Sequence, residues 1–280
     1  MLKLTALEGN IQKYDGGAMY GHLPKVLWEK NSPVDQLNRI TIITRSLLVQ
    51  TDDNKNILFE AGVSDHLSPA LRDRFGITQN ENILLKNLKA AGLTPEDIDA
   101  VIISHLHFDH TGGLLTPFEE GADKLLFPKA KIYISAGHWQ RIKKLHPREK
   151  ASFIPELHQL LKDSGQLVLV DSQRAPELGD WLRFRFSDGH TTGMLISEII
   201  TEPSPIIFTS DLMAGSWWVH LPISSSYDRF PERLIDEKKQ ILEEMITSSK
   251  RVFFVHDPKI ACALIKKDKK GRYYAEKTVL

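Results

Sequence analysis

The sequence predicts an α/β fold in four layers (αββα), in which two sheets pack face to face and helices cover their outer sides. Two observations indicate this arrangement: early strands are followed by helices, and a second series of strands is followed by a long amphipathic helix. The chain has 280 residues, of which 41% are hydrophobic and 26% charged, so it can bury a sizeable core without disulfides.

Strands are predicted where apolar and β-branched residues run together. The first two form a hairpin, because the turn residues Asp52, Asp53 and Asn54 separate them. The strand that begins at Ala100 is apolar and is expected to be buried. The predicted strands cover residues 40–50, 57–62, 100–104, 131–135, 167–170, 182–186, 195–201, 206–210, 251–255 and 261–266.

Helices are predicted from apolar residues at three- and four-residue spacing and from the signals at their ends. The first helix stops at Gly92, after which Thr94 and Asp97 form the capping box of a one-turn helix. The last helix begins at Pro231 and keeps an apolar stripe along its length. The predicted helices cover residues 80–91, 94–97, 136–145, 155–162 and 231–247.

Charge and cysteine content exclude several classes of protein. Lys+Arg and Asp+Glu both number 36, so no net charge draws the chain to nucleic acid or to an anionic membrane. The single cysteine, Cys262, excludes an internal disulfide and is typical of a reducing compartment. Because no signal peptide, membrane-spanning run, repeat or linker is recognisable, the sequence predicts one cytoplasmic domain over residues 1–280.

A short segment after the strand at Ala100 contains four potential metal ligands within six residues: His105, His107, Asp109 and His110. Side chains alternate along an extended segment, so the first two histidines are expected to point to one side, and the following turn brings the aspartate and the third histidine to a neighbouring point. Buried together without a partner, these groups would cost of order several kcal/mol, and bound metal accounts for them. Two adjacent metal sites are therefore predicted, and Gly112 and Gly113 suit the sharp turn expected after them.

Three later strands each end in a single histidine or aspartate, namely His190, Asp211 and His256. A polar residue in this position is expected at the rim of a sheet, where the ends of several strands converge. Strand ends are commonly polar, so each residue alone is weak evidence. Together with the first segment they supply five histidines and two aspartates, which is enough for two metal sites with open positions.

These residues resemble the metallo-β-lactamase superfamily, whose His-x-His-x-Asp-His motif matches residues 105–110. The later ligands occur in the same order, in the segments 189–193, 210–211 and 255–258. The resemblance implies two divalent metal ions, with zinc expected and manganese, cobalt or iron also accommodated by such ligands. It implies a first ion held by His105, His107 and His190, a second held by Asp109, His110 and His256, and Asp211 as the bridge.

The resemblance also implies a hydrolytic reaction on an ester-like bond. Two cations lower the pKa of a shared water to roughly 7, so that a hydroxide is available to attack the carbonyl carbon. Asp109 is expected to accept a proton and return it to the leaving alkoxide, while Asp211 holds both ions. Asp188 and Asp257 are candidates for orienting the ligand imidazoles.

The closer likeness is to the branch of quorum-quenching N-acyl homoserine lactone lactonases and methyl parathion hydrolase-like enzymes. Segments 15–21 and 24–28 resemble the N-terminal part of such lactonases, so residues 1–39 are expected to form a substrate-loop region. The segment 220–222, before Tyr227, resembles a loop that follows the bridging ligand.

The sequence departs from that branch at three places. Met194 stands where the pattern has a second histidine, which is not usually a ligand, and Glu60 stands where an aspartate is common. Ala214 occupies the position of a tyrosine that holds the substrate carbonyl in some of these lactonases, which weakens the lactonase interpretation in particular. The candidates to replace that tyrosine are Tyr20, Tyr227 and His220.

An acyl chain would require an apolar channel beside the metal ions. Apolar residues in the loops near the predicted ligands are candidates for its lining, and core packing explains them equally well. These candidates are Met19, Phe108, Met213, Trp217 and Trp218.

The interpretation favoured by the sequence is a lactonase acting on a small ester or lactone, and a homodimer is compatible with it. A glyoxalase II-like thioesterase and an organophosphate or aryl-ester hydrolase stay open as alternatives, the thioesterase because late lysines such as Lys266 could serve a glutathione site. Redox chemistry is disfavoured by His107, which stands where flavodiiron proteins have a glutamate. A non-catalytic metal-binding scaffold is disfavoured because all seven ligand positions are filled.

Overall fold

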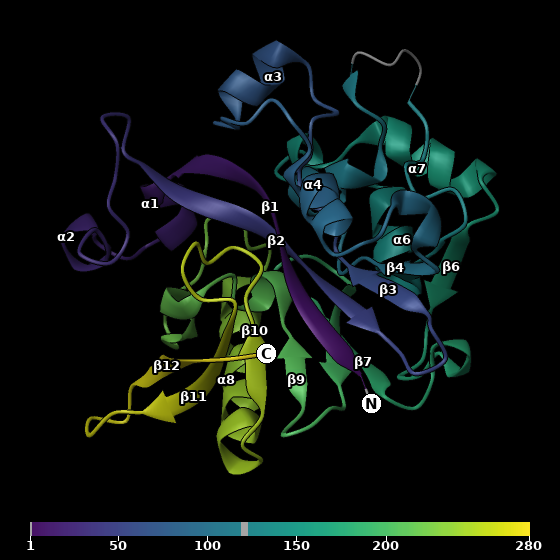
Figure 1. Cartoon of the computed structure of the whole chain (residues 1–280). Coiled ribbons are helices and arrows are strands. Elements are labelled where there is room, and N and C mark those ends of the chain that lie inside the picture. Colours follow the sequence, from purple (N-terminus) through teal and green to yellow (C-terminus); the bar gives the residue numbers. More distant parts are fainter. Residues whose placement is uncertain (1, 119–122) are drawn as a thin grey trace. The chain divides into compact units, whose positions relative to one another are not determined.

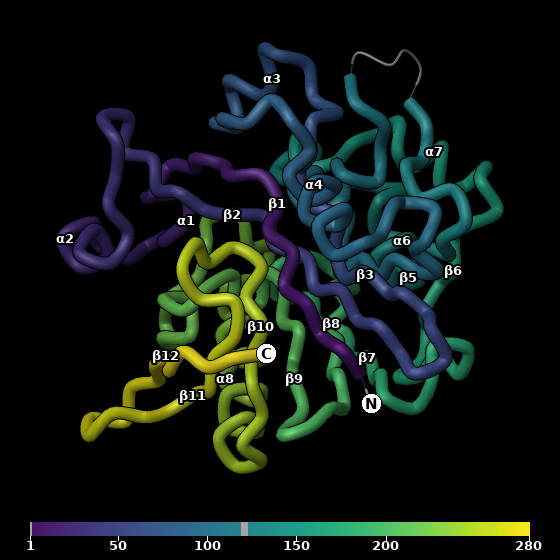
Figure 2. The backbone as a smooth tube through the Cα atoms, viewed as in Figure 1, coloured from purple at the N-terminus to yellow at the C-terminus, as the bar shows by residue number. Residues whose placement is uncertain are grey.

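Two compact units make up the computed structural model, which describes residues 2–118 and 123–280. Unit 1 comprises Met1–Gln12 with Ile43–Asp171, and unit 2 comprises Lys13–Ile42 with Ser172–Leu280. The chain changes unit three times: within its two longest strands, β1 (Lys3–Asp15) and β2 (Arg39–Gln50), which the tube in Figure 2 follows in purple and blue, and again between Asp171 and Ser172.

The first sheet has six strands in the order β1-β2-β3-β4-β5-β6. Strands β2 and β3 form the predicted antiparallel hairpin, and the strands from β3 to β6 are parallel to one another. The middle strand β4 is apolar and completely buried, as a strand in the centre of a covered parallel sheet must be. The remaining strands of this sheet are β3 (Asn56–Phe59), β4 (Ala100–Ile102), β5 (Lys131–Ser135) and β6 (Leu167–Val170).

Short helices connect the parallel strands of unit 1 (Figure 1). The helix predicted from residue 80 begins later, because the Asn82 side chain accepts a hydrogen bond from the Leu85 amide and so caps the helix. The predicted capping box of Thr94 and Asp97 is present. The helical segments are α3 (Pro69–Arg74), α4 (Ile83–Ala90), η1 (Pro95–Asp97), α5 (Phe108–Thr111), η2 (Gly112–Leu114), α6 (Ala136–Ile142), η4 (Lys150–Ser152) and α7 (Pro155–Asp163).

The second sheet has six strands in the order β12-β11-β10-β9-β8-β7. Its strands are β7 (Leu182–Ser187), β8 (Met194–Ile199), β9 (Ile206–Phe208), β10 (Arg251–Phe253), β11 (Cys262–Lys267) and β12 (Tyr273–Thr278). The predicted long helix is α8 (Pro231–Thr247), whose apolar stripe packs on this sheet through Leu234, Leu242 and Met245 (Figure 1). Cys262 is buried as expected, and burial raises the pKa of its thiol to about 11.

The N-terminal part of unit 2 contains α1 (Gly16–Tyr20) and α2 (Lys25–Trp28), and they pack against η7 (Ser216–Val219). The Tyr20 ring stacks on Trp28 with 5.0 Å between ring centroids and on Trp218 with 4.7 Å. Glycine is required at position 16, since a Cβ atom there would lie 2.3 Å from the indole ring of Trp28. The segment predicted as a substrate-loop region, residues 1–39, thus contains β1, α1 and α2 and contributes to this aromatic stack. The two remaining one-turn segments of unit 2 are η5 (Pro176–Leu178) and η6 (Ser210–Leu212).

Two strands were not predicted, β1 and β12, and several predicted strands end earlier than expected. Both missed strands mix charged and polar residues with apolar ones without a clear alternation, and only Tyr273 of β12 is buried. Three of the strands that end early, β4, β9 and β10, do so where the chain turns toward the candidate ligands. Among residues 2–118 and 123–280, none of the helices combines the length and the apolar character that a membrane span requires.

Candidate metal centre

The first group of candidate ligands lies in unit 1, directly after the central strand β4. His105 and His107 belong to the extended segment that leaves the strand, and Asp109 and His110 belong to the one-turn helix α5. All four side chains are buried, with Asp109 the most exposed at 9%. We call these four residues the unit 1 cluster.

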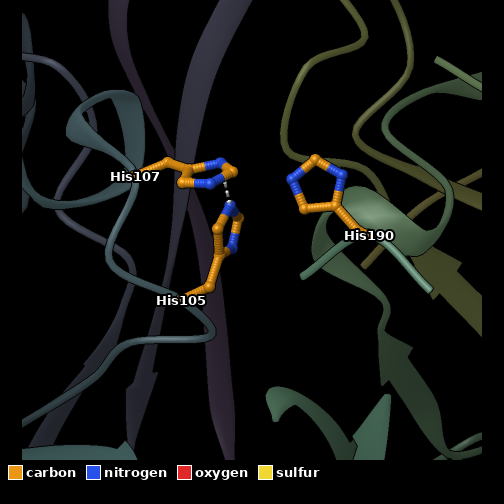
Figure 3. Close-up of side chains that lie close together, drawn as sticks. All are labelled: His105, His107 and His190. Carbon is orange, nitrogen blue, oxygen red and sulfur yellow. Dashed lines mark hydrogen bonds between the residues drawn. The ribbon is translucent and has the colours of Figure 1, made fainter. Parts of the chain in front are cut away.

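The side chains of the unit 1 cluster meet in two pairs. His105 Nε2 and His107 Nδ1 lie 3.0 Å apart, with the two rings edge to face, as Figure 3 shows. His110 Nε2 lies 3.9 Å from Asp109 Oδ1. Two nitrogen ligands of one tetrahedral zinc ion stand about 3.3 Å apart at zinc–nitrogen distances of about 2.0 Å. The histidine pair is therefore spaced nearly as two ligands of one ion are, and the Asp109–His110 pair is somewhat wider.

Buried polar groups in unit 1 hold this segment in place. Glu60 Oε1 accepts a hydrogen bond from the Ser104 amide at 3.3 Å and lies 3.5 Å from His110 Nδ1. His138 Nε2 accepts a hydrogen bond at 2.9 Å from the amide of Leu106, between the first two histidines. Glu60, which stands where the related sequences commonly have an aspartate, therefore supports the ligand segment. His138, which the sequence did not single out, binds the backbone of this segment.

The two glycines after the ligands are required for a different reason from the one expected. Neither has the positive φ of a sharp turn. Instead, a Cβ atom on Gly112 would lie 2.2 Å from the Val63 carbonyl oxygen, and one on Gly113 would lie 2.0 Å from that of Ala61. The chain after α5 thus packs directly against another segment of backbone.

The second group of candidate ligands lies in unit 2, at one edge of the second sheet. Strands β9 and β10 are parallel, and β7 runs in the same direction because it and β9 are both antiparallel to β8. The carboxyl ends of these three strands therefore share an edge, and His190, Asp211 and His256 each follow one of them. We call these three residues the unit 2 cluster.

The Asp211 carboxylate lies between the two imidazoles of the unit 2 cluster. Its Oδ2 atom is 3.3 Å from His190 Nε2, and its Oδ1 atom is 3.2 Å from His256 Nε2. Each oxygen thus faces a different histidine. This is the disposition needed for a carboxylate that bridges two cations, each with its own imidazole ligand.

A carboxylate that the sequence did not single out supports His190. Asp228 Oδ1 lies 2.7 Å from His190 Nδ1, and Asp228 Oδ2 accepts a hydrogen bond from the Ser225 amide at 2.6 Å. A proton on Nδ1 leaves the Nε2 lone pair directed at the negative Asp211 carboxylate, and a cation between them is the group that satisfies both. The ring of His190, labelled in Figure 3, is therefore held as a metal ligand is held.

The two aspartates expected to orient the ligand imidazoles accept hydrogen bonds from backbone amides instead. Asp188 accepts a hydrogen bond from the Gly193 amide. Asp257 accepts hydrogen bonds from the amides of Ser216, Lys259 and Ile260, and so fixes the turn after His256. Both stabilise backbone, because short aspartate side chains in turns reach nearby amides first.

Three candidate substrate residues line one cavity within unit 2. The cavity has a volume of about 590 Å³, which is in the range of small-molecule sites. Tyr20, Trp217 and His220 lie in its wall with Trp28 and Tyr273. The hydroxyl oxygen of Tyr20 lies 2.6 Å from that of Ser32, within a hydrogen bond. Burial raises the pKa of Tyr20 to about 12, so its hydroxyl stays protonated at neutral pH.

The other substrate candidates have different surroundings. Met213 is fully buried in the hydrophobic core beneath α8, and Met19 packs in the aromatic core of the N-terminal segment. Phe108, in unit 1, packs against Phe75 with 4.4 Å between ring centroids. Tyr227 is 40% exposed. Core packing therefore accounts for the two methionines.

These features define a class of protein, the metal-dependent hydrolases with an αββα fold. A family model for the metallo-beta-lactamase superfamily matches residues 41–231. The chain belongs to this superfamily of metallo-hydrolases, whose members bind divalent metal ions, and the predicted fold class is confirmed.

Individual relatives include lactonases. An N-acyl homoserine lactonase from Bacillus sp is 27% identical over 179 residues, which are 63% of this chain and 63% of that protein's own length. A probable metal-dependent hydrolase from Staphylococcus aureus is 26% identical, with a TM-score of 0.86 over 100% of this chain and 98% of that one. AidC, a dizinc quorum-quenching lactonase, is 21% identical, with a TM-score of 0.78 over 100% of this chain and 95% of that one. The predicted similarity to this group of enzymes is confirmed.

Proposed function

We propose that the chain is a dinuclear metal-dependent hydrolase that opens the ring of lactones, with N-acyl homoserine lactones as its substrates. In this proposal the members of the unit 1 and unit 2 clusters are the metal ligands. One ion would be held by His105, His107 and His190, the other by Asp109, His110 and His256, with Asp211 between them. The proposal includes zinc as the metal, a quorum-quenching role and a cytoplasmic location.

The observation that carries the proposal is the position of Asp211. A carboxylate with an imidazole opposite each oxygen suits two cations and not one. The unit 1 cluster is compatible with the same number, because its three imidazoles and one carboxylate offer four donors, although the His105 and His110 rings also lie only 4.1 Å apart between centroids. Neither cluster alone supplies the six residues that would each bind one ion together with the carboxylate that would bridge the two ions.

Bound divalent cations would act as Lewis acids and lower the pKa of a bound water. The chain's own residues then have distinct tasks. The imidazoles supply neutral donors, and Asp228 keeps the His190 proton on Nδ1, away from the ion. Asp109, the most exposed member of its cluster, is placed to take a proton and return it to the leaving alkoxide.

The lactone preference draws on the relatives and on the cavity of unit 2. Two of the relatives described above are lactonases, and aromatic side chains in the cavity wall suit an acyl chain. Ala214 lacks the hydroxyl that a tyrosine would offer to the substrate carbonyl. The Tyr20 hydroxyl is hydrogen-bonded to Ser32, and Tyr20, His220 and Tyr227 are the candidates to supply a donor in its place.

A hydrolysis panel with metal-loaded protein tests the substrate. It should contain homoserine lactones of several acyl lengths, S-lactoylglutathione, an aryl ester and an organophosphate triester. We expect ring opening of the lactones, its loss on treatment with a chelator and its return with zinc. Cleavage of the thioester or the triester with no action on lactones would overturn the lactonase assignment and favour a glyoxalase II-like or organophosphate hydrolase.

The variant Asp109→Asn tests the proton transfer. The amide cannot accept a proton, so kcat should fall about 10²–10⁴-fold while part of the metal is retained. Asp163→Asn, at an exposed position on α7, is the matched control and should behave as wild type. Full activity of Asp109→Asn with bound metal would refute this role.

A further inference from the structure

Helix α8 carries an adjacent acid and base, Glu237 and Lys238, that the proposed reaction does not use. The residues on either side of this pair, Asp236 and Lys239, are exposed as charged residues on a helix usually are. Glu237 is half-buried, and the side chain of Lys238 is completely buried. Burying a charged group is costly unless it is hydrogen-bonded, so both side chains need partners.

Glu237 binds the segment that leads into the ligand His190. Its carboxylate accepts hydrogen bonds from the Ser187 hydroxyl at 2.6 Å and from the amides of Asp188 and Gly189 at 3.1 Å each. Gly189 also lies directly on the helix, since a Cβ atom there would be 2.4 Å from the Cα of Leu234. The backbone just before His190 is therefore attached to α8.

Lys238 binds the segment that leads to the carboxylate behind the same histidine. Its Nζ atom donates hydrogen bonds to the carbonyl oxygens of Trp218, His220 and Ile223 at 3.0, 3.3 and 2.5 Å. An ammonium group has three donors, and all three are used here. Burial lowers the pKa of Lys238 to about 7, and the nearby Asp228 carboxylate opposes that shift.

The two attachments converge on one imidazole. The segment that Lys238 holds continues to Ser225, whose amide binds Asp228, and Asp228 in turn binds His190 Nδ1. The amide of Arg229 closes the loop by donating to the His190 carbonyl at 3.0 Å. Glu237 thus fixes the backbone just before His190, and Lys238 fixes the loop that carries the hydrogen-bond partner of this histidine.

We propose that Glu237 and Lys238 are positioning residues that hold the His190 imidazole in the orientation in which Nε2 can bind a metal ion. The inference rests on the proposed metal-dependent function. It predicts that substitutions on α8, away from the donor atoms, selectively lower the affinity for one of the two ions. A purely structural pair would lower the stability of the fold without this selectivity.

Metal titration tests the inference directly. Metal-free protein is titrated with Co²⁺ against a competing chelator, and the visible absorption of the bound cobalt is followed. The variants are Glu237→Gln and Lys238→Met, and the matched controls on the same helix are Asp236→Asn and Lys239→Met. We expect two cobalt ions in the wild type and in both controls, and an affinity for one of the two that is about 10–100-fold weaker in each test variant.

The possible outcomes separate this inference from the proposed function. If the wild type binds two cobalt ions and both test variants bind each ion as tightly as the wild type does, the positioning role is overturned and the proposed function stands. If the wild type binds no cobalt, the proposed function fails and the inference with it. Should Lys238→Met not fold, the milder Glu237→Gln decides, since it keeps one acceptor oxygen and the shape of the side chain.

Discussion

The two ligand clusters contain the same kinds of side chain but are built in different ways. The unit 1 cluster comes from six consecutive residues after one strand, whereas the unit 2 cluster is assembled from the ends of three strands. Local backbone geometry alone brings His105 and His107 together. Asp211 meets His190 and His256 only because strand pairing aligns their strands. The unit 2 cluster should therefore depend more strongly on supporting contacts elsewhere.

The supports behind the clusters differ accordingly. In unit 1, Glu60 and His138 bind the amides of the ligand segment itself. In unit 2, support reaches His190 through Asp228 and, farther away, through two residues of α8. The ligand segment is thus held by direct hydrogen bonds in unit 1, whereas part of the support in unit 2 reaches His190 through intermediate residues.

The largest expected effect comes from removing one ligand from each cluster. His110→Ala and His256→Ala should each lower the affinity for the same ion by more than about 100-fold, because a direct ligand contributes more than a supporting group. Metal content and competition titrations give the affinities. Loss of the ion in only one of the two variants would show that the clusters do not share it.

A smaller effect is expected from the supporting carboxylates. Asp228→Asn should weaken metal binding about 10–100-fold, and Glu60→Gln should weaken it less. The reason is the distance to the imidazole nitrogen, which is 2.7 Å for Asp228 and 3.5 Å for Glu60. An equal or larger loss in Glu60→Gln, measured in the same titration, would contradict the stronger dependence of unit 2 on remote support.

The smallest expected effect is on the stability of the folded state at acidic pH. Hydrogen bonds from Arg185 lower the pKa of Glu244, on α8, from 4.5 to about 2. The carboxylate therefore stabilises the folded state above pH 4.5, and this contribution is lost as the pH falls from 4.5 toward 2. Because the Glu244 side chain is only partly buried, solvent screening limits the contribution to about 1 kcal/mol or less.

Urea unfolding at pH 7, 4.5 and 3 measures this contribution, with Glu244→Gln as the comparison. The difference in unfolding free energy between wild type and variant should shrink as the pH falls. Hydrogen exchange should place the early loss of protection in unit 2 peptides that include α8. A difference that is independent of pH, or a loss confined to unit 1, would argue against the role of this ion pair.

Sequence patterns predicted most elements because their signals are local. The apolar β4, the amphipathic α8 and the capping box of η1 were all recognisable from residues close together in the chain. Strands β1 and β12 were missed because their burial depends on which neighbour they pair with, and their alternation is weak. For the substrate region the sequence left lining and core packing open; Met213 lies in the hydrophobic core, and no short-range signal distinguishes an apolar loop residue from a core residue.

The sequence by itself determined the superfamily, the fold class and the seven candidate ligands, since a dense run of histidines after a buried strand has few other physical explanations. Only the tertiary structure revealed Asp228 behind His190, and the attachment of that region to Glu237 and Lys238. Hydrogen bonds between residues far apart in the chain leave no pattern in the sequence. They depend on which side chains the paired strands and the packed helix bring within about 3 Å of each other.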